Sequence, residues 1–172
     1  MPVPPPLPSY LEVAALESLV EGVVAPEFID VNGHMNIRHH LDYCASGAEA
    51  LCREAGIDDG YRAGRSLGVF TAEHHIRYTG ELHQGDRVSV HTRFLDRGTK
   101  AGHLISFLLD RERRTVACVL EISIVHVDMR TRRPTPFPDD VARVFDARIA
   151  ESRALPWSAP VSGAMGIRTP RA

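Results

Sequence analysis

Cysteine and aromatic residues are scarce in this sequence. Of its 172 residues only three are cysteine, and Phe, Trp and Tyr together make up 6%. Cys44, Cys52 and Cys118 stand apart and form no CxxC pair, which argues against a disulfide framework. We therefore expect a reducing compartment, the cytoplasm.

Long apolar runs and an excess of positive charge are also missing. No stretch approaches the roughly 18 consecutive apolar residues that span a bilayer. The proline-rich start, 2–8, lacks the basic segment and apolar run of a signal peptide. A formal net charge of −2 provides no global positive field for polyanions. We expect neither nucleic acid nor a membrane as partner.

What is present fits one soluble domain. Apolar residues make up 44% and charged residues 24% of the chain, ordinary values for a globular protein. The length leaves little room for a second core. We expect an N-terminal lead at 1–19, a folded domain at 20–150 and an irregular tail at 151–172.

One segment has a clear helical period. Asn36 is a suitable N-cap and Gly56 a suitable terminator, and small residues such as Gly47 would let a second element approach closely. Apolar side chains recur between them at three- and four-residue intervals, namely Ile37, Leu41, Cys44, Ala45, Ala48, Leu51, Cys52 and Ala55. We predict a long helix packed against a sheet.

The remaining chain predicts mainly β-structure. Strands are expected at 20–28, 67–78, 87–95, 103–109 and 115–128, with turns about every dozen residues. Within 67–78 we expect Phe70, Ala72, His74, Ile76 and Tyr78 on one side. Short helices are expected at 10–19 and 139–150, and a glycine-containing loop before 67.

This order of elements predicts the architecture. A strand, a long helix and four strands fit a five-stranded, twisted antiparallel sheet wrapped around the helix, an α+β arrangement called the hotdog fold. Such a sheet leaves an exposed edge strand, which a second copy commonly pairs. We expect a homodimer or a dimer of dimers.

The segment 27–36 is the best candidate for chemistry. It places the Asp30 carboxylate in a turn just before the helix, where Gly33 lets the backbone approach a ligand. The free N–H groups of a helix N-terminus can stabilise a developing oxyanion, each by roughly 10²–10³ in rate. An ionised Asp30 could attack a thioester carbonyl or deprotonate a water. The alternative is that Asp30 and Asn32 only form an Asx turn.

A family resemblance favours the catalytic interpretation. The stretch Asp30-x-x-Gly33-His34-Met35-Asn36 resembles the signature of the 4-hydroxybenzoyl-CoA thioesterase-like hotdog family, and Ile76-Arg77-Tyr78 followed by Gly85-Asp86 resembles a second signature. The resemblance implies an acyl-CoA substrate, no cofactor, catalysis by Asp30, and a polarising N–H near His34 or Asn36. The sequence departs from the pattern at Ile37, where many members carry Asn, and at His40, where many carry an aromatic residue.

A closer resemblance is to thioesterases found beside, or fused to, L-carnitine dehydrogenase, which are thought to hydrolyse betainyl-CoA. It rests on 32–36, 64–70, 126–138 and 154–157. Binding a quaternary ammonium group calls for aromatic faces or a carboxylate. Besides Gly33 and Met35 in the turn, the candidate substrate-binding residues are Tyr43, Phe70, Glu73, Tyr78 and Trp157, and candidates for the nucleotide part of CoA are Arg97, Lys100 and Arg130.

Several other residues were weighed for chemistry. The adjacent pairs His39-His40 and His74-His75 point in different directions and form no chelate, so we expect no metal. His34 could orient the substrate or simply cap the helix. We expect Glu49 to be exposed, and Cys44 and Cys52 to be buried structural thiols.

Two alternative functions remain from the sequence. One is a hotdog hydratase or dehydratase acting on acyl-CoA, although the spacing from Asp30 to His34 is shorter than its motif expects. The other is a non-catalytic module that binds acyl-CoA. Fold alone does not separate these functions from a thioesterase.

Overall fold

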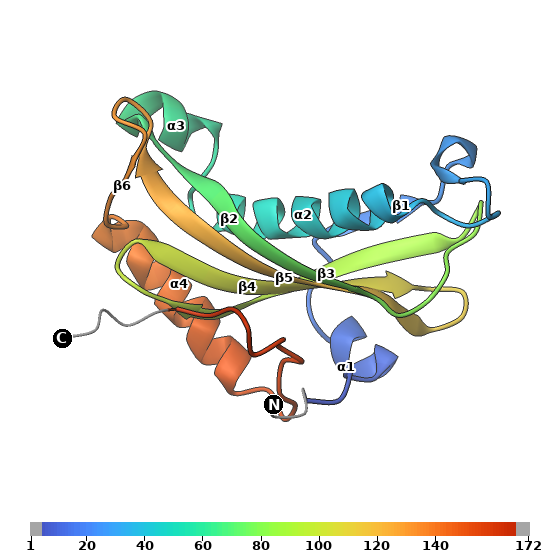
Figure 1. Ribbon diagram of the computed structural model, residues 1–172. Helices are drawn as coiled ribbons and strands as arrows, with labels where there is room; N and C mark the ends of the chain where they lie inside the picture. The colour runs from blue at the N-terminus through green and yellow to red at the C-terminus, as the bar shows by residue number, and fades with distance from the viewer. Residues whose placement is uncertain (1–4, 168–172) are drawn as a thin grey trace.

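The computed structural model describes residues 5–167 and contains four α-helices, one 3₁₀ turn and six strands within that range (Figure 1). In chain order these are α1 (Tyr10–Ala14), β1 (Val20–Val23), η1 (Pro26–Phe28), α2 (Ile37–Glu54), α3 (Asp59–Arg65), β2 (Leu67–Tyr78), β3 (Arg87–Arg97), β4 (Ala101–Asp110), β5 (Thr115–Asp128), β6 (Arg133–Pro134) and α4 (Asp139–Arg153).

A single antiparallel sheet curls around the long helix α2, which confirms the predicted hotdog fold. The strand order is β1-β3-β4-β5-β2, so the twelve-residue strand β2 lies at an edge. The only strand not expected is the two-residue β6, which pairs with Val127 and Asp128 at the end of β5. Figure 1 shows α2 crossing one side of the sheet and α4 lying along the opposite part of the molecule.

Helix α2 forms where the sequence predicted it. The Asn36 side chain accepts a hydrogen bond from the Arg38 N–H at 3.1 Å, and Gly56 follows the helix with φ of +88°. Its buried face includes Gly47, where an added Cβ would overlap Val90 Cγ1 and lie 2.9 Å from Thr92 Oγ1. The expected close approach of a second element is therefore confirmed, and that element is β3.

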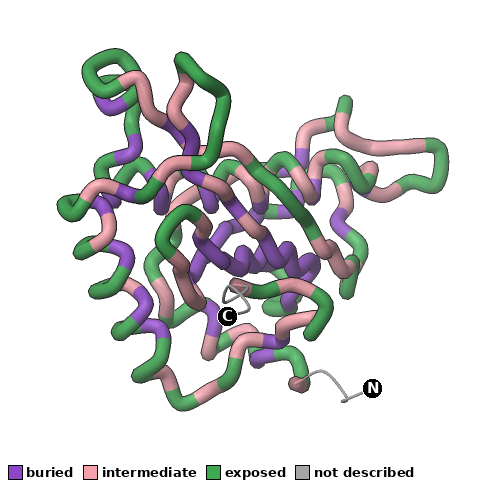
Figure 2. Tube along the Cα trace, turned by 60° about the vertical axis from the view of Figure 1, so that its left-hand side comes forward, coloured by how far each residue is buried: buried purple, intermediate pink, exposed green. Residues whose placement is uncertain are grey.

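The other face of the sheet is covered by α1 and by residues that follow α4. Because side chains alternate along a strand, Ile105 and Phe107 point away from the α2 side and pack with Val13 of α1. Residues 154–167, which we call the C-terminal segment, add Trp157 over this face. Figure 2 shows the buried residues concentrated in the strands and on the inner sides of the helices.

Some predicted boundaries were wrong. The first helix ends at Ala14 rather than 19, and the strand expected at 20–28 stops at Val23 because Pro26 begins η1. The glycine-containing loop is the helix α3, capped by Asp58, whose Oδ1 accepts from the Tyr61 N–H at 2.7 Å. Local capping thus outweighed the helix-weakening glycines in that segment.

Strand β2 contains a bulge that changes the predicted alternation. Its pairing with β5 shifts between Thr71 and Glu73, so one extra residue, Ala72, interrupts the ladder. Thr71 and His74 consequently line the same cavity beside α2. The prediction that Phe70 shares a side with His74 and the later even-numbered residues was therefore wrong.

Candidate active site

The turn that carries Asp30 is held by its own backbone. The Asp30 N–H donates to the His34 carbonyl, and the Gly33 N–H donates to the Asp30 carbonyl, both at 3.0 Å. Gly33 has φ of +81°, a conformation that L side chains rarely adopt. The Met35 N–H donates to the Leu82 carbonyl at 2.7 Å, which ties the turn to the segment after β2.

The Asp30 carboxylate is fixed at one oxygen and open at the other. Its Oδ1 accepts from the Asn32 N–H at 2.8 Å and lies 4.0 Å from His34 Nδ1. The predicted Asx turn therefore forms. Within residues 5–167 no hydrogen-bond partner is found for Oδ2, and the side chain is 19% exposed. A reacting group can thus reach an oriented carboxylate.

Backbone N–H groups without a partner among the described residues occur in this segment at His34, one of the two expected positions, and at Ile37. The Asn36 N–H is already bonded to the Phe28 carbonyl at 2.8 Å, and the Arg38 N–H to the Asn36 side chain. In the described part of the chain no acceptor is found for the N–H of Ile37, the first residue of α2. An oxyanion at this helix N-terminus would meet that donor.

Two residues join the site from other directions. His40, in the first turn of α2, is 4% exposed, and its ring packs edge-on against Tyr78 at 5.4 Å between centroids. Tyr78 was an expected substrate-binding residue. No role was predicted for His40, although its departure from the family signature had marked the position as unusual. The Asp30 turn, the start of α2 and the end of β2 thus meet at one end of the molecule.

Other candidate substrate residues lie apart within one chain. Tyr43 donates to the Val23 carbonyl at 3.3 Å and packs against Phe28. Phe70 lies under the Arg132 guanidinium, 4.8 Å from its carbon to the ring centroid. Glu73 lines a separate open cavity near Lys100. They do not form a common aromatic cage.

Three other residues that were expected to bind CoA or the quaternary ammonium group already contact side chains of this chain. Arg97 forms two 2.6 Å hydrogen bonds with Asp146, and Arg130 lies 3.3 Å from Asp128. Trp157 lies on the outer face of the sheet, 4.1 Å from the Arg93 guanidinium carbon to its ring centroid. None of these contacts involves the Asp30 turn.

A groove lies between α2 and the edge strand β2, and no residue of the Asp30 turn lines it. Its volume is about 210 Å³, and α2 contributes the small residues Ala45 and Ala48 to its wall. Glu49 stands at this groove, exposed as expected, with Oε1 3.2 Å from Arg53. Burial raises the pKa of the Cys52 thiol to about 12, which fits the predicted structural thiol.

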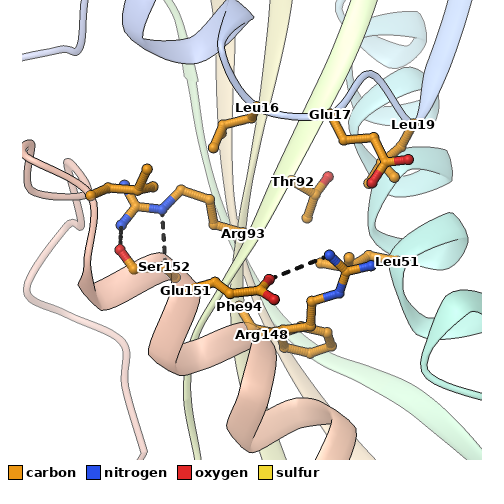
Figure 3. A pocket seen from close by; sticks show the side chains of 11 residues that line it. Leu16, Glu17, Leu19, Leu51, Thr92, Arg93, Phe94, Arg148, Glu151 and Ser152 are labelled. Carbon is orange, nitrogen blue, oxygen red and sulfur yellow. Dashed lines mark hydrogen bonds and ion pairs between the residues drawn. The ribbon is translucent and has the colours of Figure 1, made fainter.

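A second cavity, of about 130 Å³, lies beside β3 (Figure 3). There Arg93 Nε donates to Ser152 Oγ at 2.9 Å, and Arg148 lies 3.4 Å from Glu151. Arg93 Nη1 is buried without a hydrogen-bond partner among the described residues, and the lining contains no residue of the Asp30 turn. It therefore offers no chemistry to the site.

The described residues contain neither a cluster of metal ligands nor a membrane-spanning helix. Among residues 5–167, no three His, Cys, Asp or Glu side chains are placed to hold a metal ion together. No helix in the same range is long and apolar enough to cross a bilayer.

Comparison with protein families gives one clear match. The model of the thioesterase-like superfamily matches residues 24–145, which include the Asp30 turn, α2 and the four long strands β2 to β5. This range confirms the thioesterase resemblance found in the sequence and favours it over the hydratase and binding-module alternatives.

Relatives with curated names point to one reaction. The chain is 29% identical over 147 residues to the betainyl-CoA thioesterase of Pseudomonas aeruginosa, covering 86% of this chain and 92% of that protein. It is 34% identical over 146 residues to the L-carnitine dehydrogenase/betainyl-CoA thioesterase of Ruegeria pomeroyi, covering 84% of this chain and 28% of that protein. It thus spans under a third of the fused protein.

Solved structures confirm the fold. A hypothetical protein from Staphylococcus aureus in complex with CoA has a TM-score of 0.78 at 23% identity, covering 89% of this chain and 97% of that one. A putative thioesterase from Pseudomonas putida has a TM-score of 0.72 at 24% identity, covering 96% and 100%.

Proposed function

The chain belongs to the thioesterase-like superfamily and is an acyl-CoA thioesterase, and we propose that its acyl group is betainyl. The products would be glycine betaine and CoA. The names of its relatives and the resemblance around 126–138 support this substrate. Among the residues, Asp30 supports the reaction most directly, because its Oδ2 has no hydrogen-bond partner among the described residues, and the Ile37 N–H at the start of α2 is likewise unpartnered.

In the proposed mechanism the Asn32 N–H aims the ionised Asp30 carboxylate. This carboxylate attacks the thioester carbonyl, or removes a proton from a water that attacks it. Negative charge then collects on the carbonyl oxygen, where the Ile37 N–H and the positive end of the α2 dipole stabilise it. In the first route the C–S bond breaks to leave a mixed anhydride with Asp30 and the CoA thiolate; a water then hydrolyses the anhydride, which frees Asp30 and the acyl carboxylate, and a proton from that water converts the thiolate to the thiol. In the second route the C–S bond breaks as the proton held by Asp30 passes to the CoA sulfur, and the acyl group leaves as the free acid, which ionises.

The proposed assembly is a homodimer, or a dimer of such dimers, formed through β2. This edge strand is twelve residues long, and Thr71, Ala72, Glu73 and His74 are exposed in its middle. Unpaired strand edges invite pairing with a second copy. Such pairing would place the groove beside α2 at the subunit boundary. The proposed compartment is the cytoplasm, where the three free cysteines would stay reduced.

Tyr78 is the proposed aromatic face for the trimethylammonium group. It is 44% exposed and packs on His40 beside the first turn of α2. An aromatic face attracts such a cation by about 0.5–2 kcal/mol, depending on its desolvation. A neutral acyl group of the same shape gains none of this attraction.

A matched pair of thioesters tests the substrate. We would measure thiol release from betainyl-CoA and from 3,3-dimethylbutanoyl-CoA, in which carbon replaces the charged nitrogen. We expect kcat/KM to be at least about tenfold higher for betainyl-CoA, a difference of about 1.4 kcal/mol. Equal values, or a preference for the neutral thioester, would rule out the betainyl assignment while leaving the thioesterase activity intact.

A further inference from the structure

His40 is a buried histidine that the proposed reaction does not use. Its Nδ1 lies 3.4 Å from the carbonyl oxygen of Asn36, the N-cap of α2. A carbonyl can only accept, so in this contact Nδ1 carries the hydrogen and donates it. The ring therefore braces the first turn of α2 from inside.

The second ring nitrogen is left without a partner. His40 Nε2 is sealed from solvent and has no hydrogen bond within the described residues. Around it lie the Tyr78 ring from β2 and the backbone of Gly80 from the segment that follows. A buried polar atom of this kind lowers the stability of the fold and needs an explanation.

The charge state of the ring follows from its surroundings. Burial is the largest influence and lowers the pKa of His40 below its ordinary value; the backbone of Asn36 and of Gly80 opposes this shift without reversing it, and His34 and His39 lower the pKa further. The ring is therefore neutral at neutral pH. With the hydrogen on Nδ1, the lone pair stays on Nε2, so the unsatisfied atom is a consequence of keeping the Nδ1 donor.

A purely apolar ring would fill the same space without that loss of stability. Features that lower stability, such as a buried polar atom without a hydrogen bond, concentrate at functional sites. The position of His40, between the start of α2 and the end of β2, is such a site.

We propose that His40 is a positioning residue for thioester hydrolysis. Its Nδ1–H holds the Asn36 carbonyl, and its ring edge holds Tyr78, so that the first turn of α2 keeps a fixed place against the end of β2. The Ile37 N–H and the Asp30 carboxylate flank that turn and keep their separation because of it. The inference rests on the proposed roles of Asp30 and Ile37.

Three substitutions separate positioning from space filling. His40→Phe keeps a ring and loses the donor, while His40→Asn and His40→Leu introduce side chains with the same branching and number of heavy atoms, of which only Asn retains a donor near the Nδ1 position. We expect His40→Phe to unfold at the same or a higher temperature, yet to have kcat at least about tenfold lower with little change in KM. His40→Asn should retain at least about fivefold more kcat than His40→Leu.

A second readout does not depend on turnover. In wild type, ¹⁵N NMR of the imidazole should place the hydrogen of His40 on Nδ1. Hydrogen on Nε2 would overturn the inference, and so would a His40→Phe variant with wild-type kcat or equal losses in His40→Asn and His40→Leu. If wild type hydrolysed thioesters but Asp30→Asn did so equally well, the proposed mechanism would fail instead.

Discussion

His34 Nδ1 lies 4.0 Å from Asp30 Oδ1, whereas the Asn32 N–H lies 2.8 Å from the same oxygen. The backbone, and not the histidine, therefore holds the carboxylate. His34 Nδ1 also lies 3.4 Å from the Met35 carbonyl, which gives the ring a local partner. The site resembles a backbone-aimed carboxylate more than a carboxylate–histidine dyad.

This geometry predicts a modest role for His34. His34→Ala should lower kcat/KM by no more than about tenfold, because the separation exceeds hydrogen-bond distance. Steady-state thiol release would measure the change, with circular dichroism as a check of folding. A loss of about a thousandfold or more would instead make His34 a general acid or base.

Tyr78 should contribute to the choice of acyl group. Tyr78→Leu should lower kcat/KM for betainyl-CoA by about 3- to 30-fold, the effect of losing one cation–π contact. The value for 3,3-dimethylbutanoyl-CoA should change little. Phe70→Leu is the matched control, because the bulge in β2 separates Phe70 from the side that Tyr78 occupies. Equal losses for both thioesters would exclude cation recognition by Tyr78.

Two glycines in helices should respond in opposite ways to alanine. Gly47→Ala should destabilise the fold by about 1–3 kcal/mol, because the new methyl group would overlap Val90. Gly64 in α3 has open space around its Cα, so Gly64→Ala should stabilise by about 0.4–1 kcal/mol. Urea unfolding would give both values. A stable Gly47→Ala protein would contradict the close approach of α2 to β3.

The pH dependence of stability should involve a buried pair on the outer face of the sheet. Glu121 accepts from His103 at 2.8 Å and from the Ser162 N–H of the C-terminal segment at 2.7 Å. Burial alone would raise the pKa of Glu121, but these hydrogen bonds outweigh it and the pKa lies below its ordinary value. The ionised form therefore stabilises the fold above about pH 4.5, and this contribution is lost as the pH falls through the lowered pKa.

Glu121→Gln should accordingly destabilise the protein at pH 7 by about 2–4 kcal/mol and flatten the decline in stability below about pH 4.5. Urea unfolding between pH 3 and pH 7 would measure both effects. Glu112→Gln is a control, because Glu112 is 45% exposed and its pair should contribute less than about 1 kcal/mol. If the stability of Glu121→Gln declined below about pH 4.5 as steeply as that of wild type, the proposed role of Glu121 would be contradicted.

Local signals made most of the fold predictable. The stripe of α2, its N-cap Asn36 and the strands at 67–78 and 115–128 all appear where the sequence placed them. The bulge at Ala72 was not predictable, because it arises from pairing between β2 and β5. It reversed the expected side of Phe70 relative to Tyr78. Long-range packing likewise decided the path of the C-terminal segment.

The local structure around Asp30 was predictable to the same extent. Asp30, Gly33 and Asn36 belong to one short segment whose turn and cap chemistry the sequence contains. The Asn36 N–H bonds to the Phe28 carbonyl, a contact that local patterns do not reveal, and the free donors of this segment lie at His34 and Ile37. His40 gained its place from Tyr78 and Gly80, about forty residues along the chain.

Turnover of betainyl-CoA by wild type and by Asp30→Asn tests the central claim most directly. Asn has nearly the same shape and still accepts from the Asn32 N–H, so the turn should remain folded. We predict that kcat falls by at least about 10³-fold, because an amide neither attacks the thioester nor accepts a proton. A well-folded Asp30→Asn protein that retains more than about a tenth of the wild-type kcat would contradict the account.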